Sequence, residues 1–137
     1  MVDNLKCLMK IDRFEDLEIW QEARFIAQQI FELTLGDKFS KDFKLRDQIR
    51  GSSGSIMDNI AEGFGRGGNK EFIQFLSIAK GSNDETRSQV YRACDYQYID
   101  EETKNDLVEK SVQLSKKISS FIQYLRKSTY RGPKFPM

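Results

Sequence analysis

The placement of proline is the feature that most constrains this sequence. The 137-residue chain contains only two prolines, Pro133 and Pro136, and both fall within its last five residues. Proline inside a helix removes a backbone donor and clashes with the preceding turn, so no residue upstream breaks a helix in this way. The chain has the length of one domain, and its 31% charged and 39% hydrophobic residues suit amphipathic helices. The sequence therefore predicts a single all-α domain.

Apolar residues recur at steps of three and four in four separate segments, which is the spacing of amphipathic helices. The first segment runs from Phe14 to about Gly36, and the second runs from Leu45 to the glycines that begin at residue 63. Asn69 and Asp100 are residue types that cap helices, and they precede the third and fourth segments. Short connections between four such helices predict an antiparallel up-down-up-down four-helix bundle. The expected division is an N-terminal arm (1–13), the bundle (14–127) and a flexible C-terminal tail (128–137).

Small residues interrupt the apolar stripes of the second and third predicted helices. Five consecutive glycines and serines occupy residues 51–55, and Gly81 and Ser82 lie in the middle of the third segment. Glycine and serine in a helix cost roughly 0.5 to 1 kcal/mol each relative to alanine, unless close packing compensates. We therefore expect these two patches to meet in one tight helix crossing.

The first and third segments carry more apolar residues than one core face requires. The predicted core stripe of the first helix comprises Leu17, Trp20, Ala23, Ala27, Ile30 and Phe31. The additional apolar residues are Ile19, Phe25, Ile26, Ile73 and Ile78. These additional residues either widen the core of one chain or pack against another subunit.

The stretch from Asn59 to Arg66 gathers the polar side chains with the greatest catalytic potential. Glu62 is a candidate base and Arg66 a candidate anion clamp. However, the chain has no histidine, and no nucleophile or metal-ligand set accompanies the carboxylate. We therefore interpret Asn59, Glu62 and Arg66 as a buried hydrogen-bond network at the end of the second helix, with Glu62 paired to Arg50 or Arg87.

Other candidate sites have ordinary structural explanations. The glycine-rich loop at residues 63–68 lacks the preceding strand and the Gly-Lys-Ser/Thr ending of a nucleotide-binding loop. Two cysteines, Cys7 and Cys94, are too few for a zinc cluster in a chain without histidine. Four serines lack an accompanying base and are assigned to packing: Ser52, Ser53, Ser55 and Ser82. We expect no metal, no cofactor and no enzymatic activity.

Basic residues collect toward the C-terminal end, although the net charge is only +1. No acidic residue follows Glu109. The candidate contacts to a phosphate backbone are Lys116, Lys117, Arg126, Lys127, Arg131 and Lys134. A helix that simply ends in solvated lysines is the alternative interpretation. No stretch approaches the roughly 20 apolar residues of a membrane span, and the N-terminus lacks a signal peptide's apolar core, so a cytoplasmic protein is expected.

Two motifs carry a resemblance to a known family. They are Asn59-Ile-Ala-Glu-Gly-Phe-Gly-Arg66 and Ala79-Lys80-Gly81-Ser82, which follow one another in the second and third segments. With them, the region from Phe14 to Ile99 resembles the four-helix-bundle proteins encoded within intervening sequences of bacterial 23S rRNA genes, and the fourth helix agrees in pattern. The motif positions singled out are Asn59, Glu62, Gly63, Arg66, Gly81 and Ser82.

The resemblance implies a ring-like homo-oligomer, a pentamer, of antiparallel four-helix bundles. It also implies kinship with the accessory proteins of diversity-generating retroelements, which bind nucleic acid and a reverse transcriptase through a basic surface. Two departures weaken such a surface on the second helix, since Gly51 follows Arg50 where the family often has an arginine pair, and Asp58 replaces a small residue. The expected function is a non-catalytic accessory protein associated with RNA or DNA. The alternative is a structural or protein-interaction scaffold that binds no nucleic acid.

Overall fold

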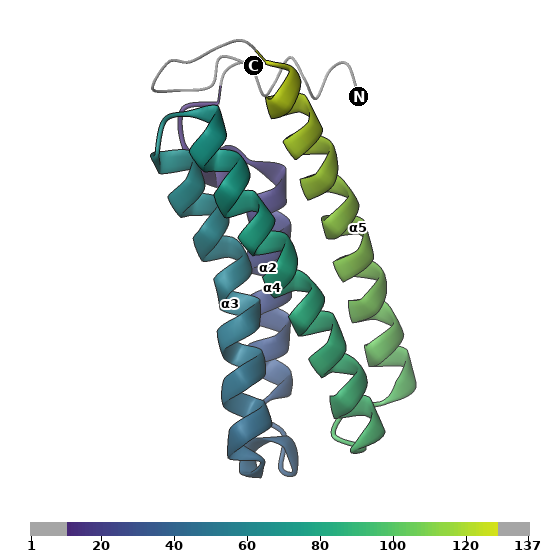
Figure 1. The fold of residues 1–137 in the computed structure, drawn as a ribbon. Coiled ribbons are helices and arrows are strands. Elements are labelled where there is room, and N and C mark those ends of the chain that lie inside the picture. Colours follow the sequence, from purple (N-terminus) through teal and green to yellow (C-terminus); the bar gives the residue numbers. More distant parts are fainter. Residues whose placement is uncertain (1–10, 129–137) are drawn as a thin grey trace.

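The computed structural model describes residues 11–128, and these residues form four long helices. Successive helices run in opposite directions along the bundle, so the described part is all-α with the predicted up-down order (Figure 1). Two short 3-10 turns, η1 (Phe14–Asp16) and η2 (Phe39–Lys41), precede the first two helices. The long helices are α2 (Glu18–Leu33), α3 (Phe43–Gly65), α4 (Asn69–Asp95) and α5 (Glu101–Lys127).

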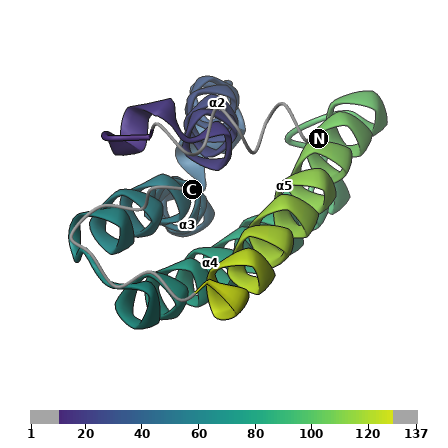
Figure 2. The ribbon, with the colours of Figure 1, turned by 90° about the horizontal axis from the view of Figure 1, so that it is seen from above.

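The four helices form an open arc rather than a closed square. Seen from above, α3 lies between α2 and α4, and α5 packs on α4 and diverges from α2 (Figure 2). The contact between α2 and α5 is the smallest of the four helix-to-helix contacts. One side of the bundle is therefore less tightly packed than the others. None of the helices in residues 11–128 is long and apolar enough to cross a membrane.

The core follows the three-four spacing closely in the second half of the chain. In α4 the predicted stripe from Phe72 to Ala93 is buried, and in α5 the stripe from Leu107 to Leu125 is buried. In α2 the prediction was partly wrong, because Phe31 is 45% exposed while Ile19 and Ile26 lie in the core of this one chain. The reason is that α2 packs mainly on α3 and makes a smaller contact with α5, which brings its adjoining stripe inward.

Helix boundaries differ from the prediction at two places. The chain is extended at Leu17, so the first long helix begins at Glu18 rather than at Phe14. Asn69 is not a cap; it is the first residue of α4, and its side-chain nitrogen donates to the Leu125 carbonyl at 3.0 Å. The predicted cap at Asp100 is confirmed, since its carboxylate accepts from the backbone N–H of Thr103 at 2.8 Å. Ile11, in the segment expected to be a loose arm, is buried against the core.

Helices α3 and α4 approach each other closely at Gly63. A Cβ atom there would lie 2.6 Å from the Cβ of Phe75 and 3.0 Å from the Cδ1 of Phe72. The predicted crossing through the small-residue patches was wrong for their glycines, because these face away from the neighbouring helix. A Cβ would meet nothing within 4 Å at Gly51, Gly54 or Gly81.

Candidate functional site

The ion pair of the motif lies on the surface, near the C-terminus of α3. Glu62 and Arg66 are one helical turn apart, and their side chains meet at 2.7 Å while remaining 55% and 50% exposed. The Arg66 guanidinium also lies 4.9 Å from the ring centroid of Phe75 on α4. The predicted buried network around Glu62 was therefore wrong. A carboxylate one turn from an arginine pairs with it locally, which leaves Arg50 and Arg87 to bond elsewhere.

The remaining motif residues form a separate polar chain across the α3–α4 seam. The Asn59 side-chain nitrogen donates to the backbone carbonyl of Ser55 at 2.8 Å and to its hydroxyl at 2.9 Å. The Ser82 hydroxyl in turn donates to the Ser55 hydroxyl at 3.1 Å. The structure thus divides the motif into two groups, Asn59 with two serines and Glu62 with Arg66, while Gly81 faces outward.

A buried layer of polar side chains lies beneath this surface, and only part of it was predicted. The Thr86 hydroxyl donates to Ser52 at 2.8 Å, and the Ser52 hydroxyl donates to the Gln89 side-chain oxygen at 2.6 Å. On the other side of α4, Asn83 and Ser111 exchange two hydrogen bonds of 2.8 and 2.9 Å. All three hydroxyls form hydrogen bonds between helices, and for Ser52 this agrees with its assignment to packing from the sequence.

The buried hydrogen-bonding roles of Gln89 and Asn83 were not predicted from the sequence. Asn83 occupies the three-four step between Ala79 and Thr86, so its position on the core stripe was a usable signal. A buried amide has four hydrogen-bonding positions, so a partner for Asn83 was to be expected. Spacing along the chain could not identify that partner as Ser111 in α5.

The described part of the chain offers little for metal or thiol chemistry. No group of three or more His, Cys, Asp or Glu side chains within residues 11–128 is placed to hold a metal ion. Burial and the neighbouring Glu101 carboxylate raise the pKa of the Cys94 thiol, which lowers the fraction of reactive thiolate. Cys7 lies outside the described residues.

The basic residues of α5 do not act as one group. Lys117 reaches across to α2, where it pairs with Glu22 and with Glu18 at 3.2 Å. The hydrogen bonds to these carboxylates raise the pKa of Lys117, and its charge is neutralised within the chain. By contrast, Lys116, Arg126 and Lys127 are exposed and form no ion pair within residues 11–128. Arg131 and Lys134 lie outside the described residues.

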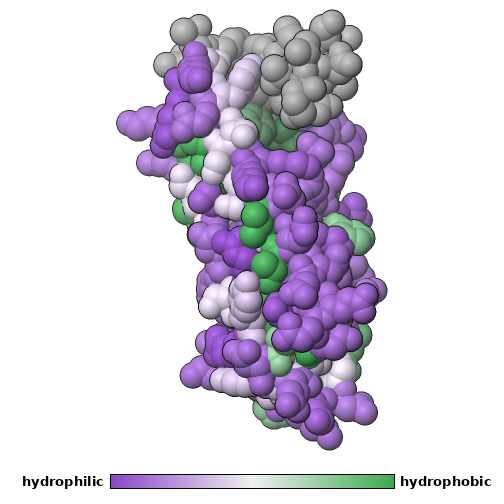
Figure 3. Space-filling model, turned by 90° about the vertical axis from the view of Figure 1, so that its right-hand side faces the viewer, coloured by the Kyte–Doolittle hydropathy of each residue, from purple (hydrophilic) through white to green (hydrophobic). Residues whose placement is uncertain are grey.

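The face that displays α5 is largely hydrophilic and is crossed by a narrow hydrophobic strip (Figure 3). Arg126 and Lys127, which form no ion pair within residues 11–128, occupy the last turn of α5. Basic side chains at this end complement the negative end of the helix dipole, so their position is stable whether or not they bind an anion. Six basic residues were predicted from the sequence to contact phosphate. Three of them are exposed and unpaired within residues 11–128: Lys116, Arg126 and Lys127.

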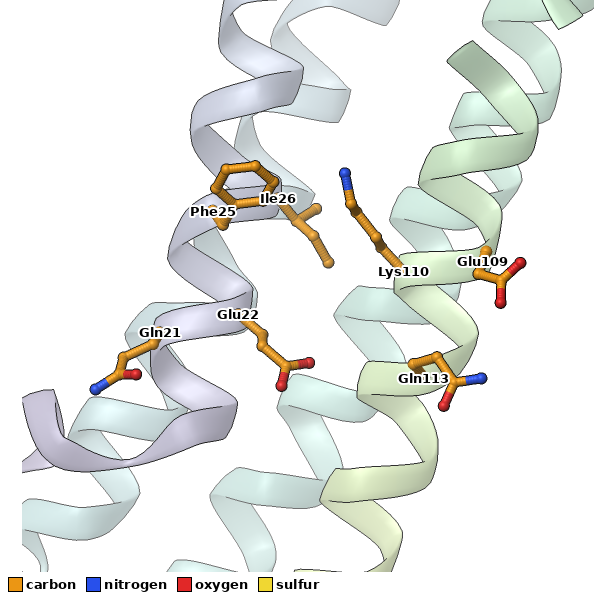
Figure 4. Close-up of a pocket in the computed structure, with 7 residues that line it drawn as sticks. All are labelled: Gln21, Glu22, Phe25, Ile26, Glu109, Lys110 and Gln113. Carbon is orange, nitrogen blue, oxygen red and sulfur yellow. The ribbon is translucent and has the colours of Figure 1, made fainter. Parts of the chain in front are cut away.

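A groove lies between α2 and α5, where the bundle is most open. Its volume is about 370 Å³, and the side chains of Glu22 and Ile26 point from α2 toward α5 (Figure 4). Phe25 is 56% exposed, and the Lys110 ammonium lies 4.9 Å from its ring centroid. The seven lining residues are Gln21, Glu22, Phe25, Ile26, Glu109, Lys110 and Gln113. The groove therefore has an apolar floor, and charged side chains lie at its edges.

Comparison with solved structures supports the fold. The chain is similar to the crystal structure of a protein of unknown function from the S23 ribosomal protein family of Bacteroides thetaiotaomicron, with a TM-score of 0.70. The two chains are 24% identical, and the match covers 77% of this chain and 98% of the other. A search among curated proteins finds no match. The family model described as 23S rRNA-intervening sequence protein matches residues 15–120. The chain therefore belongs to the 23S rRNA-intervening sequence protein family.

Proposed function

We propose that this protein is a non-catalytic, homo-oligomeric accessory protein that binds RNA or DNA. The observation that carries the proposal is the set of free cations on α5. Arg126 and Lys127 end the helix, Lys116 lies on its exposed side, and none of the three has a carboxylate partner within residues 11–128. Unpaired lysines and arginines bind phosphate by releasing the counterions of a nucleic acid.

The absence of catalysis is part of the proposal and rests on how the polar side chains are used. Glu62, the candidate base, is paired with Arg66 and exposed to water. The buried hydroxyl of Ser52 donates to Gln89, which leaves it no base to activate it as a nucleophile. These uses of Glu62 and Ser52 support a protein without a catalytic base or nucleophile among residues 11–128.

Assembly into a ring of several copies, five in the form implied by the family resemblance, completes the proposal. Phe25 and Ile78 are 56% and 52% exposed, and contact between subunits is a reason for such residues to remain apolar. A ring also repeats each basic helix end, so weak contacts act together on one nucleic acid strand. The resemblance to accessory proteins of diversity-generating retroelements supports the same use of a basic surface.

The test is retention of a labelled RNA by the full chain at about 50 mM and about 200 mM salt. We expect binding at low salt that falls steeply as salt increases. The double variant Arg126→Gln/Lys127→Gln should reduce the salt slope by about 0.7 for each phosphate of a single strand that the protein no longer neutralises. The matched control is Lys80→Gln/Arg92→Gln on α4, which removes the same charge from another face. Lack of retention at low salt would contradict the proposal.

The alternative function, a scaffold for protein interactions, is favoured by one observation. The groove between α2 and α5 has an apolar floor formed by Phe25 and Ile26, which suits a protein partner better than a phosphate. An assembled chain that binds no RNA or DNA at low salt would favour the scaffold.

A further inference from the structure

The two edges of α2 differ in the charges and rings that they carry. On the edge toward α5, Glu18 and Glu22 both pair with Lys117, which offsets one of their two negative charges. On the edge toward α3, Phe31 is 45% exposed and the Arg50 guanidinium lies over its ring, 4.6 Å from the centroid. The edge toward α3 therefore carries an aromatic ring and a guanidinium, whereas Glu18 and Glu22 lie on the edge toward α5.

A second pair of the same kind lies one helical turn away on α3. Phe43, the first residue of α3, is 65% exposed, and the Arg46 guanidinium lies 4.9 Å from its ring centroid. Arg46 and Arg50 are four residues apart in one helix, so their side chains are neighbours on its surface. The two arginine–phenylalanine pairs consequently form one surface, which we call the arginine–aromatic surface (Phe31, Phe43, Arg46 and Arg50).

The arginines of this surface are held in place by hydrogen bonds. Arg50 Nε donates to the hydroxyl of the buried Thr34 at 2.8 Å, and Arg46 Nη1 donates to the Ser40 carbonyl at 3.2 Å. Arg46 Nε is paired with Asp47 at 2.8 Å. Arg50 forms no ion pair with any carboxylate of the described chain, so its two terminal nitrogens remain available to an anion. Side chains fixed beforehand lose less entropy when they bind.

The surrounding charges favour an anionic partner. Five basic and three acidic residues lie between Asp37 and Arg50. Two of these acids are already engaged, because Asp47 pairs with Arg46 and Asp42 caps α3 and accepts from a tyrosine hydroxyl. Lys41 and Lys44 are exposed. A partner that combines negative charge with flat apolar groups matches this surface.

Single-stranded nucleic acid has this combination of properties. Unpaired bases stack on exposed aromatic rings and on guanidinium planes, while the phosphates accept hydrogen bonds from arginine. We infer that the arginine–aromatic surface binds single-stranded nucleic acid by stacking bases on Phe31 and Phe43 beside Arg46 and Arg50. The inference rests on the proposed function, and it adds a second contact surface, far along the chain from the basic end of α5.

The experiment compares matched substitutions in the full chain, using a labelled oligouridine of about 16 nucleotides, the upper end of common site sizes. Phe43→Leu keeps an apolar side chain and removes the aromatic face, so binding should weaken at least about fivefold, the lower end of the effect of base stacking. Phe43→Tyr keeps the face and should bind as the unsubstituted chain does. Tyr91→Leu is the control, because Tyr91 is 45% exposed and also lies beneath a cation, Lys104, but on α4.

The outcomes separate this inference from the proposed function. Selective loss in Phe43→Leu, together with tighter binding of the single strand than of a duplex of equal length, would support the stacking surface. Equal binding by Phe43→Leu, Tyr91→Leu and the unsubstituted chain would overturn the inference and leave the proposed function standing. Absence of RNA binding by the unsubstituted chain would overturn both. The molecular mass of the Phe43→Leu assembly is a further check. If this mass changes while the RNA affinity per chain stays the same, Phe43 is a contact between protein subunits and the inference is overturned.

Discussion

The seam between α3 and α4 and the seam between α2 and α5 are built in different ways. Between α3 and α4, the backbone comes so close at Gly63 that a Cβ would lie 2.6 Å from the Cβ of Phe75. The polar groups inside that seam are buried and paired, as Ser52 is with Thr86 and Gln89. Between α2 and α5, the polar connections are partly exposed, namely the ion pairs of Lys117 and the bonds of Gln29 to Asp106 and Lys110, and an open groove of about 370 Å³ remains.

The difference indicates which part of the bundle is fixed within one chain. A close-packed seam with paired buried groups has one geometry, because any displacement leaves an unsatisfied polar atom or a steric clash. A seam held by exposed ion pairs gains little from each pair and is screened by salt. We therefore expect α3 and α4 to form the rigid centre, and α2 and α5 to separate more easily.

The largest effect should come from filling the close approach in the rigid seam. Gly63→Ala places a methyl group against Phe75 and should destabilise the chain by about 2 to 3 kcal/mol through overpacking. Urea unfolding measures this change. Gly81→Ala is the matched control, since it meets nothing within 4 Å and should stabilise its helix by up to about 1 kcal/mol. Equal stability of the two variants would refute the close seam.

Removal of a buried hydroxyl from the same seam should have the next largest effect. Ser52→Ala deletes the donor to Gln89 and leaves a buried carbonyl oxygen unpaired, at a cost of about 1 to 2 kcal/mol. Ser77→Ala, on the exposed side of α4, should change stability by less than about 0.5 kcal/mol. If thermal unfolding ranks the two variants in the opposite order, the buried layer is not a source of stability.

The α2–α5 seam should respond less, and its response should depend on salt. Lys117→Met removes the ion pairs to Glu18 and Glu22, and the loss should be about 0.5 kcal/mol at low salt because all three side chains remain partly exposed to solvent. At about 1 M salt the difference should disappear. Lys116→Met, which breaks no ion pair in residues 11–128, provides the comparison. A loss that is unaffected by salt would mean that Lys117 stabilises by packing alone.

The same ion pairs predict a small effect of pH. The pKa of Lys117 is raised in the folded chain, so its contribution is fully present below the unfolded value of about 10.4 and is lost as pH rises through the higher folded value. The difference in melting temperature between Lys117→Met and the unsubstituted chain should therefore be constant near neutral pH and vanish at strongly alkaline pH. A difference that vanished on acidification to about pH 6 would contradict the assignment.

The two seams also differ in how far the sequence predicted them. Periodicity located the four helices and the core stripes of α4 and α5, because a buried helix face repeats at a fixed spacing in the chain. The two small-residue patches meet through their serines, since Ser82 donates to Ser55, but the glycines at 51, 54 and 81 do not make the close contact, which is at Gly63. Composition does not give the rotation of a helix about its axis. Spacing could not show that Lys117 would meet Glu18 and Glu22, which lie about a hundred residues away in the chain.

The molecular mass of the full chain in solution is the measurement that tests the central claim most directly, because the proposed function depends on assembly of several copies. Light scattering should give a multiple of the 16.0 kDa of one chain, with five copies for the ring that the family resemblance implies. A mass of 16.0 kDa at every protein concentration would contradict the account, since one chain alone would leave Phe25 and Ile78 exposed to water and would present a single basic helix end.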